Sequence, residues 1–222
     1  MPDDHTQKNI DRFNEAAPSW EDPSKVELAL RITAAIRTEV PLNQNMRIME
    51  YGCGTGLLCT ELAPDVGHVL AVDISQGMLS VLEKKLPLSA SNITLQLIDS
   101  EQEFSPGKSF GLIYSSMTLH HIQDPLKQLQ RLCAWLQPGG FLAIADLCED
   151  SQSFHQNTAG VAHHGFRQSD VVSSFAHAGL TAIRYSVPCT FKKPDKEGRM
   201  KEFSVFLCVG KVEAAGELTA KQ

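Results

Sequence analysis

The stretch MRIMEYGCGTGLLCTEL, residues 46–62, joins a short apolar run to a helical pattern through Gly52, Gly54 and Gly56. The run before Gly52 has the length and composition of a buried strand. Glycine tolerates positive φ angles and lets a ligand lie directly on the backbone. In an open parallel sheet, ligands bind beyond the carboxyl ends of the strands. The stretch therefore indicates a ligand-binding loop or, because glycine repeats alone are weak evidence, merely a tight strand-to-helix turn.

The next apolar run favours the binding interpretation. Residues 68–74, HVLAVDI, have the pattern of a strand, and Asp73 lies at its end, 17 positions after Gly56. A carboxylate at a strand end can accept hydrogen bonds from both hydroxyls of a ribose, although alone it is equally typical of a solvated strand end. The dinucleotide fingerprint requires a glycine at position 57, where this chain has Leu57, so the spacing is E-x-G-x-G-x-G from Glu50. The glycine loop and Asp73 together predict a ligand that contains a ribose.

Strand and helix patterns alternate along most of the chain. Short, nearly continuous apolar runs are typical of strands buried on both faces of a parallel sheet. They span residues 47–52, 68–74, 92–99, 110–116 and 141–147. Helical spacing occurs over residues 6–16, 23–38, 57–63, 75–85, 125–136 and 169–178. Two further strands, 180–189 and 202–211, are joined by a charged turn, so we expect an antiparallel hairpin. The alternation predicts an α/β fold with helices on both sides of the sheet.

Composition restricts the class of protein. The chain has 222 residues, 42% of them hydrophobic and 21% charged, which is an ordinary balance for one globular domain. The net charge of −6 makes nucleic acid an unlikely primary partner. The N-terminus lacks the apolar core of a signal peptide, and no apolar run reaches the roughly 20 residues that span a bilayer. Six cysteines without a C-x-x-C pair complete the pattern of a cytoplasmic protein with reduced thiols.

Four motifs, in order, resemble those of class I S-adenosylmethionine-dependent methyltransferases. They are MEYGCGTG (49–56), AVDISQGML (71–79), FGLIYSSMTLHHI (110–122) and LQPGGFLAIADL (136–147). The similarity covers about residues 10–210 and is greatest to the small-molecule branch that includes ubiquinone/menaquinone-biosynthesis-like enzymes. The resemblance implies a Rossmann-like, doubly wound, mostly parallel seven-stranded sheet with one antiparallel strand. It also implies one methyltransferase domain over residues 1–222, with an N-terminal helical lid (1–40), a core (45–211) and a polar tail (212–222).

The resemblance implies a set of residues that bind S-adenosyl-L-methionine. The glycine loop would line the methionine and ribose portions, Asp73 the ribose, Ile74 and Met78 the adenine, and Ser115 the methionine. Asp99 would accept a hydrogen bond from the adenine amine, with Ser100 beside it, although DSEQEF (99–104) departs from the commoner D-[AG]-x-x-L-P pattern. The predicted cofactor-binding residues are Gly52, Cys53, Gly54, Thr55, Gly56, Asp73, Ile74, Met78, Asp99, Ser100, Ser115 and Trp20.

Trp20 is included because the opening RFNEAAPSWEDP (12–23) fits a segment, F-[DN]-x-x-A-x-x-[WY], that folds as a lid over the cofactor in similar enzymes. On this interpretation Phe13 and Trp20 close the site. The alternative is that the two aromatic side chains only attach the N-terminal helix to the core.

Three histidines are the candidates for catalysis. Methyl transfer needs an aligned acceptor and the exclusion of water, and a base matters only when the acceptor loses a proton. His120 in TLHHI follows the fourth strand, and it could line the cleft, act as a general base or be structural. His163 and His164 in GVAHHGF lie after the fifth strand, where this fold usually shapes the acceptor pocket. No cluster of acidic residues accompanies them, so we expect no metal site.

The sequence therefore predicts a cytoplasmic, S-adenosylmethionine-dependent methyltransferase of a small-molecule acceptor. We expect no nucleic-acid or membrane partner and a monomer or homodimer. Two alternatives remain open, a methyltransferase of protein or RNA and a catalytically silent cofactor-binding protein. The amide-targeting signature N/D-P-P-[YF] is absent from the fourth strand, which reads SSMT (115–118) instead.

Overall fold

The computed structural model of the protein describes residues 2–87, 92–98, 104–107, 109–149, 154–155, 158–195 and 198–214. Its strands are β1 (Arg47–Tyr51), β2 (His68–Asp73), β3 (Ile93–Leu97), β4 (Phe110–Ser116), β5 (Leu136–Leu147), β6 (Leu180–Pro194) and β7 (Met200–Val212). Its helices are α1 (Asp4–Ala16), α2 (Pro23–Glu39), α3 (Leu57–Leu62), α4 (Gln76–Lys85), α5 (Pro125–Trp135) and α6 (Gln168–His177), with single 3-10 turns at η1 (Ala17–Ser19), η2 (Ala63–Asp65) and η3 (Leu119–His121).

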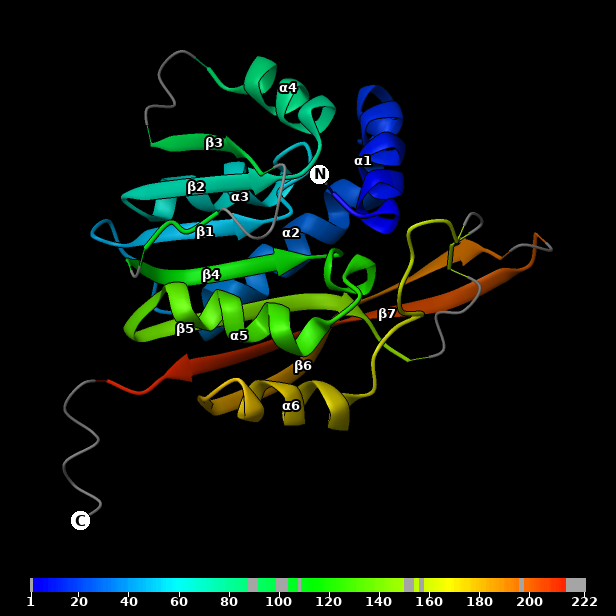
Figure 1. The fold of residues 1–222 in the computed structure, drawn as a ribbon. Helices are drawn as coiled ribbons and strands as arrows, with labels where there is room; N and C mark the ends of the chain where they lie inside the picture. The colour runs from blue at the N-terminus through cyan, green and yellow to red at the C-terminus, as the bar shows by residue number, and fades with distance from the viewer. Residues whose placement is uncertain are drawn as a thin grey trace. The chain divides into compact units, whose positions relative to one another are not determined.

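The strands form a seven-stranded sheet in the order β3-β2-β1-β4-β5-β7-β6 (Figure 1). Strand β7 runs antiparallel to both β5 and β6. The predicted fold class, a mostly parallel doubly wound sheet with one antiparallel strand, is confirmed. The chain divides into two compact units, Met1–Ser105 and Pro106–Gln222, which are described in turn. A single domain over residues 1–222 stays a prediction, and residues 215–222 of its polar tail lie outside the described residues.

In the first unit, β2 pairs in parallel with β1 on one side and β3 on the other. Strands β1 and β2 are buried from their second residue onward, as their apolar runs predict. The prediction that the third strand is buried on both faces is wrong, because most of β3 is exposed or half-buried. Strand β3 ends the sheet and has one strand neighbour, so its outer edge and part of its faces meet solvent.

Short polar side chains decide where the helices of this unit begin. The Asp22 carboxylate, which caps α2, accepts hydrogen bonds from the backbone N–H groups of Ser24 and Lys25, and Pro23 occupies the first turn. The Ser75 hydroxyl caps α4 by accepting from the N–H of Met78. These side chains replace the helical partners that the first N–H groups of any helix lack. The helix predicted over residues 23–38 therefore begins at Pro23.

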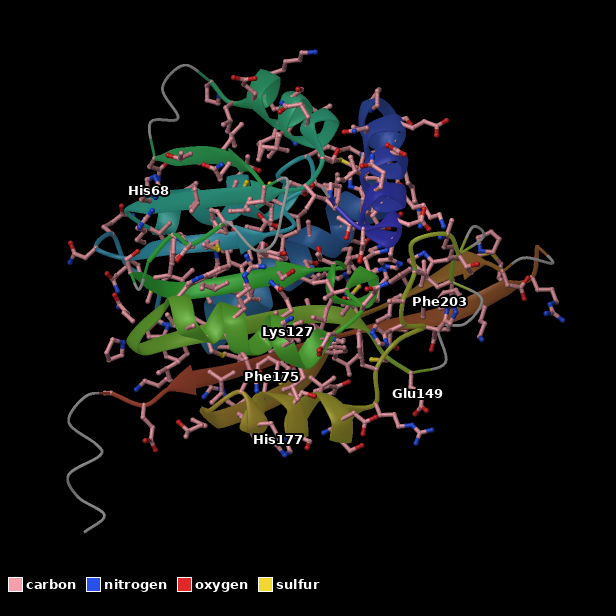
Figure 2. The ribbon with its side chains drawn as sticks, viewed as in Figure 1. His68, Lys127, Glu149, Phe175, His177 and Phe203 are labelled. Atoms are coloured by element: carbon pink, nitrogen blue, oxygen red, sulfur yellow. The ribbon has the colours of Figure 1, made fainter. Side chains whose placement is uncertain are left out.

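In the second unit, β4 and β5 pair in parallel, and β7 pairs with both β5 and β6. Helix α6 follows the edge of this unit beside β6 (Figure 1). Figure 2 shows Phe175 pointing from α6 towards the strands, where it is fully buried, and His177 pointing away. Among the described residues, no helix is both long and apolar enough to cross a membrane.

Two boundaries in this unit differ from the prediction. Strand β5 begins at Leu136, directly after α5, and residues 137–140 form a bulge between the pairs Phe110–Leu136 and Leu112–Phe141. The hairpin is also longer than predicted, because β6 extends to Pro194 and β7 begins at Met200. Beyond the last pair of β7 with β5, the hairpin continues as a two-stranded ribbon.

Part of the chain between β5 and α6, called the late segment (the described residues 154–155 and 158–166), is anchored to this unit by its backbone. The N–H groups of Ala162 and His163 both donate to the carbonyl of His120, at 2.9 and 3.0 Å. Phe166 donates to the carbonyl of Leu147. At Gly165, whose φ is +97°, a Cβ atom would lie 2.1 Å from the carbonyl oxygen of Cys148. Only glycine allows the late segment to approach β5 this closely.

We predict that Gly165→Ala destabilises the protein more than Gly179→Ala. Both glycines have positive φ, but a Cβ at Gly179 meets no atom within 4 Å. The positive φ costs an alanine about 1–2 kcal/mol at either position. The clash with the backbone of Cys148 adds about 1–3 kcal/mol to the loss at Gly165. Urea unfolding of the two variants measures the difference, and equal losses would show that the late segment relaxes away.

Candidate active site

The glycine loop that leaves β1 is tied to the end of β2. The N–H groups of Gly52 and Cys53 donate to the carbonyl of Val72 at 2.8 and 3.0 Å. Gly52, Gly54 and Gly56 all have positive φ angles, of 76°, 55° and 82°. The loop therefore turns back over the carboxyl end of β2. Because glycine has no side chain, the backbone at these three positions is not covered by side chains of the loop itself.

Asp73 lies at the end of β2 and holds both neighbouring segments. One carboxylate oxygen accepts from the N–H of Gly54 at 2.7 Å, and the other accepts from the N–H of Ser75 at 2.8 Å. Burial raises the pKa of the Asp73 carboxyl, and the backbone hydrogen bonds oppose this rise. A carboxylate has about four lone-pair sites, so Asp73 can also accept hydrogen bonds from ligand hydroxyls. The geometry fits a ligand with two hydroxyls, while the predicted contact with a ribose stays a prediction.

The N-terminal helix is fastened to α4 by one amide. The Asn14 side-chain oxygen accepts from the Ser75 hydroxyl and from the N–H of Gly77, both at 2.8 Å. A Cβ at Gly77 would lie 3.0 Å from the Cα of Asn14, so the two helices meet backbone to backbone here. Asn14 therefore completes the first turn of α4 from another helix. In Figure 1, α1 and α4 lie beside each other.

Trp20 lies next to the glycine loop. Its indole nitrogen is 3.9 Å from the position that a Cβ would take at Gly54. Phe13 packs edge-on against Trp20, with ring centroids 5.7 Å apart. Glu21 and Lys85 form an ion pair between the segment after η1 and the last turn of α4. Trp20 thus lies beside the glycine loop, while closure of the site by Phe13 and Trp20 stays a prediction.

The other predicted cofactor-binding residues are placed as follows. Thr55 is buried in the glycine loop, Met78 is buried in α4, and Ile74 is half-buried between β2 and α4. Asp99 and Ser100 lie outside the described residues. Ser115 is buried near the end of β4, in the second unit. Their roles toward the cofactor stay predictions.

The second unit contains a buried His–Asp pair. The Nδ1 atom of His120 lies 2.6 Å from one Asp146 carboxylate oxygen, and the backbone N–H of His120 donates to the other at 3.1 Å. Leu147 N–H donates to the same carboxylate at 2.7 Å. Burial by itself raises the pKa of the Asp146 carboxyl, but the attraction of His120 and these hydrogen bonds lower it below its ordinary value. Asp146 is therefore ionised at neutral pH.

The remaining histidines near this pair differ in their surroundings. The ring centroids of His121 and His155 lie 4.1 and 4.9 Å from that of His120. His163 donates from Nε2 to the carbonyl of Ile122 at 3.0 Å, so this nitrogen is not free to act as a base. His164 is exposed on the same segment. His163 and His164 as catalytic residues stay predictions. Among the described residues, no cluster of metal-ligating side chains could hold an ion.

The sequence prediction missed two residues that organise these sites, Asp146 and Asn14. Asp146 lies near the end of the apolar run 141–147, and a carboxylate in such a buried run requires a hydrogen-bonding partner. That requirement is a usable signal, but the partner itself cannot be read from the sequence. Asn14 is part of the F-[DN] motif, yet its contact with Ser75 spans 61 positions of the chain.

Comparison with known proteins agrees with this geometry. The sequence model of a family described as "Methyltransferase domain" matches residues 24–193. The chain belongs to this methyltransferase family. The predicted class I membership is confirmed, and the fold and the relatives support S-adenosylmethionine as the cofactor.

Three relatives illustrate the range of the family. An uncharacterized methyltransferase of Schizosaccharomyces pombe is 31% identical over 61% of this chain and 54% of its own. A ubiquinone biosynthesis O-methyltransferase of Coxiella burnetii is 24% identical over 71% of each chain. A solved structure of Haemonchus contortus phosphoethanolamine N-methyltransferase 2 in complex with S-adenosyl-L-methionine has a TM-score of 0.64 at 16% identity, over 82% of this chain and 52% of that one. This methyltransferase thus spans about half the length of two of the three.

We predict that Asn14→Ala weakens the attachment of α1 in this methyltransferase. The substitution leaves the Ser75 hydroxyl and the Gly77 N–H without their shared acceptor, which costs about 1–3 kcal/mol of unfolding free energy. Gln7→Ala on the same helix is the control, because the Gln7 side chain donates to the exposed Asp11 carboxylate one turn along α1. Hydrogen exchange of α1 should rise in the first variant alone. Equal exchange in both variants would contradict an anchoring role for Asn14.

Proposed function

We propose that the protein transfers a methyl group from S-adenosylmethionine to a small-molecule acceptor. The observation that carries this proposal is the glycine loop bound to the Asp73 carboxylate at the carboxyl end of β2. Bound S-adenosylmethionine supplies a methyl group attached to a sulfonium sulfur. When the methyl group is transferred, the sulfur becomes a neutral thioether. The protein has to bind and align the two reactants and exclude water, and it need not bond covalently to either.

Residues of the first unit are proposed to bind the nucleoside portion. Asp73 would accept hydrogen bonds from the ribose hydroxyls, since a carboxylate offers about four lone-pair sites. The backbone at Gly54 has room for a ligand, because among the described residues a Cβ there would meet only the Trp20 nitrogen, at 3.9 Å. Met78 and Ile74 would provide apolar contacts to the adenine. Ser115 of the second unit is proposed to contact the methionine portion.

A small molecule is the acceptor that the chain's features favour. Aromatic and imidazole rings gather on the late segment, where Phe154 packs against His155 and His163 against Phe166. Such an apolar lining with a few polar groups is typical of small-ligand sites. The net charge of −6 disfavours RNA. The branch that includes ubiquinone-biosynthesis enzymes is retained as a proposal, supported by the Coxiella relative. Cytoplasmic location and a monomeric or homodimeric state stay predictions.

Calorimetry of S-adenosylmethionine binding tests the cofactor assignment. Asp73→Ala should weaken binding by about 2 kcal/mol, roughly 30-fold, because charge-assisted hydrogen bonds to the ligand are lost. Asp11→Ala, an exposed carboxylate on α1, should leave the affinity unchanged. Thermal unfolding of each variant shows whether the fold is retained.

A ligand lacking one hydroxyl separates the ribose contact from a general effect on the loop. The wild type should bind the 2′-deoxy analogue of S-adenosylhomocysteine more weakly than S-adenosylhomocysteine itself, whereas Asp73→Ala should bind the two alike. Equal discrimination by both proteins would refute the ribose role. Binding without methylation of any small molecule would favour the catalytically silent alternative, and labelling of protein or RNA would favour a macromolecular acceptor.

A further inference from the structure

Buried side-chain nitrogens of the second unit that lack a hydrogen-bond partner among the described residues include Nε2 of Gln128 and Nε2 of His120. His120 is 1% exposed, and it follows β4 on η3. Polar atoms inside native proteins are nearly always hydrogen-bonded, so an exception requires an explanation. A nitrogen that awaits a donor from a ligand is one such explanation. The other ring nitrogen of His120 is already engaged by Asp146.

The contact with Asp146 decides which form His120 takes. An ionised carboxylate can only accept hydrogen bonds, so Nδ1 carries the proton and Nε2 of the neutral ring carries the lone pair. The backbone N–H of His120 also donates to this carboxylate, at 3.1 Å. The ring and the main chain of His120 are therefore both hydrogen-bonded to Asp146. Asp146 therefore sets the tautomer and the orientation of the imidazole together.

Titratable side chains from three parts of the second unit lie against His120. They are Asp146 on β5, His121 beside it on η3, and His155 from the late segment. His121 donates from Nδ1 to the carbonyl of Gly160 at 2.7 Å.

We propose that His120 is the general base of the methyl transfer, that Asp146 is its positioning residue, and that the acceptor reacts through a phenolic hydroxyl. This inference rests on the proposed function. An acceptor whose attacking atom carries no proton has no use for such a base. A phenol, with a pKa near 10 as in tyrosine, is acidic enough to transfer its proton during attack. Phe154 and Phe166 on the late segment favour a planar aromatic acceptor.

The step balances as follows. The acceptor O–H bond breaks and its proton moves to Nε2 of His120, while the oxygen forms a bond to the methyl carbon. The bond from that carbon to the sulfonium sulfur breaks, and its electron pair stays on sulfur. The imidazolium, paired with Asp146, then releases the proton to solvent. His120 is 1% exposed and the His155 ring lies 4.9 Å from its ring, so the acceptor would have to displace a neighbouring side chain to reach Nε2.

The acceptor atom is identified with methyl-¹³C S-adenosylmethionine and an ultrafiltered metabolite extract. The carbon shift of the labelled methyl group distinguishes O-, N-, S- and C-methyl products, and fragmentation mass spectrometry shows whether an O-methyl product is a phenyl ether. We expect a phenyl ether. A methyl group on nitrogen, sulfur, carbon or an aliphatic oxygen overturns this inference and leaves the proposed function intact. No labelled product at all overturns the proposed function, and this inference with it.

Matched variants test the two residues. His120→Asn keeps an N–H toward Asp146 but has no lone pair at the Nε2 position, so kcat should fall by on the order of 10²–10⁴. Asp146→Asn should lower kcat in the same way, because an amide no longer fixes the tautomer or the charge. Asp170→Asn, an exposed carboxylate on α6, is the control. Cofactor affinity should stay unchanged in all three, and full turnover by either dyad variant contradicts the proposal.

Histidine nitrogen NMR gives a readout that does not depend on turnover. With ¹⁵N-labelled histidine at mildly alkaline pH, His120 should show a protonated Nδ1 and an unprotonated Nε2 in the wild type. Asp146→Asn should give a mixture of both tautomers, and Asp170→Asn should match the wild type. A proton on Nε2 of the wild-type ring under these conditions would overturn the assignment of His120 as the base.

Discussion

Each unit of this protein is organised around a carboxylate buried near the carboxyl end of a parallel strand. A charged group that is buried away from water needs hydrogen bonds from the protein to replace those that water would have made. Asp73 obtains them from the N–H groups of Gly54 and Ser75, and Asp146 from those of His120 and Leu147. In both cases the carboxylate joins the end of its own strand to a segment that follows a different one. The loops that carry the chemistry are therefore fixed by the charge, and no regular ladder of hydrogen bonds is needed.

In this arrangement, the residues proposed to bind the cofactor are separate from those proposed to meet the acceptor. The glycine loop, Asp73 and the start of α4 form one hydrogen-bonded set, to which α1 is joined through Asn14. The residues proposed to meet the acceptor lie instead on η3 and the late segment, outside the regular sheet. Loops held on a rigid scaffold can change without disturbing it, which is why one fold serves many acceptors.

The hairpin packs against the beginning of the late segment. Phe154 of the late segment lies against Phe203, with ring centroids 5.3 Å apart, and Lys193 lies 4.2 Å above its ring (Figure 2 labels Phe203). Lys193 also donates to the Phe154 carbonyl at 3.1 Å. The two-stranded ribbon beyond β5 thus supports the beginning of the late segment and with it His155. From the sequence, a charged turn at a hairpin tip is expected to be exposed to solvent. In the structure, contact with an aromatic ring distinguishes Lys193 from its exposed neighbours.

The sequence by itself determined the elements, the fold class and the glycine loop with Asp73, because these depend on short-range patterns: apolar runs, helical spacing and glycine spacing. It did not determine that the third strand is half exposed, since exposure depends on which strand ends the sheet. Nor did it reveal Asp146 as the partner of His120, or Asn14 as the partner of Ser75, because those contacts join residues 26 and 61 positions apart. Only the tertiary structure decided these pairs, since a buried polar group is satisfied by whichever residue the folded chain brings within hydrogen-bonding distance.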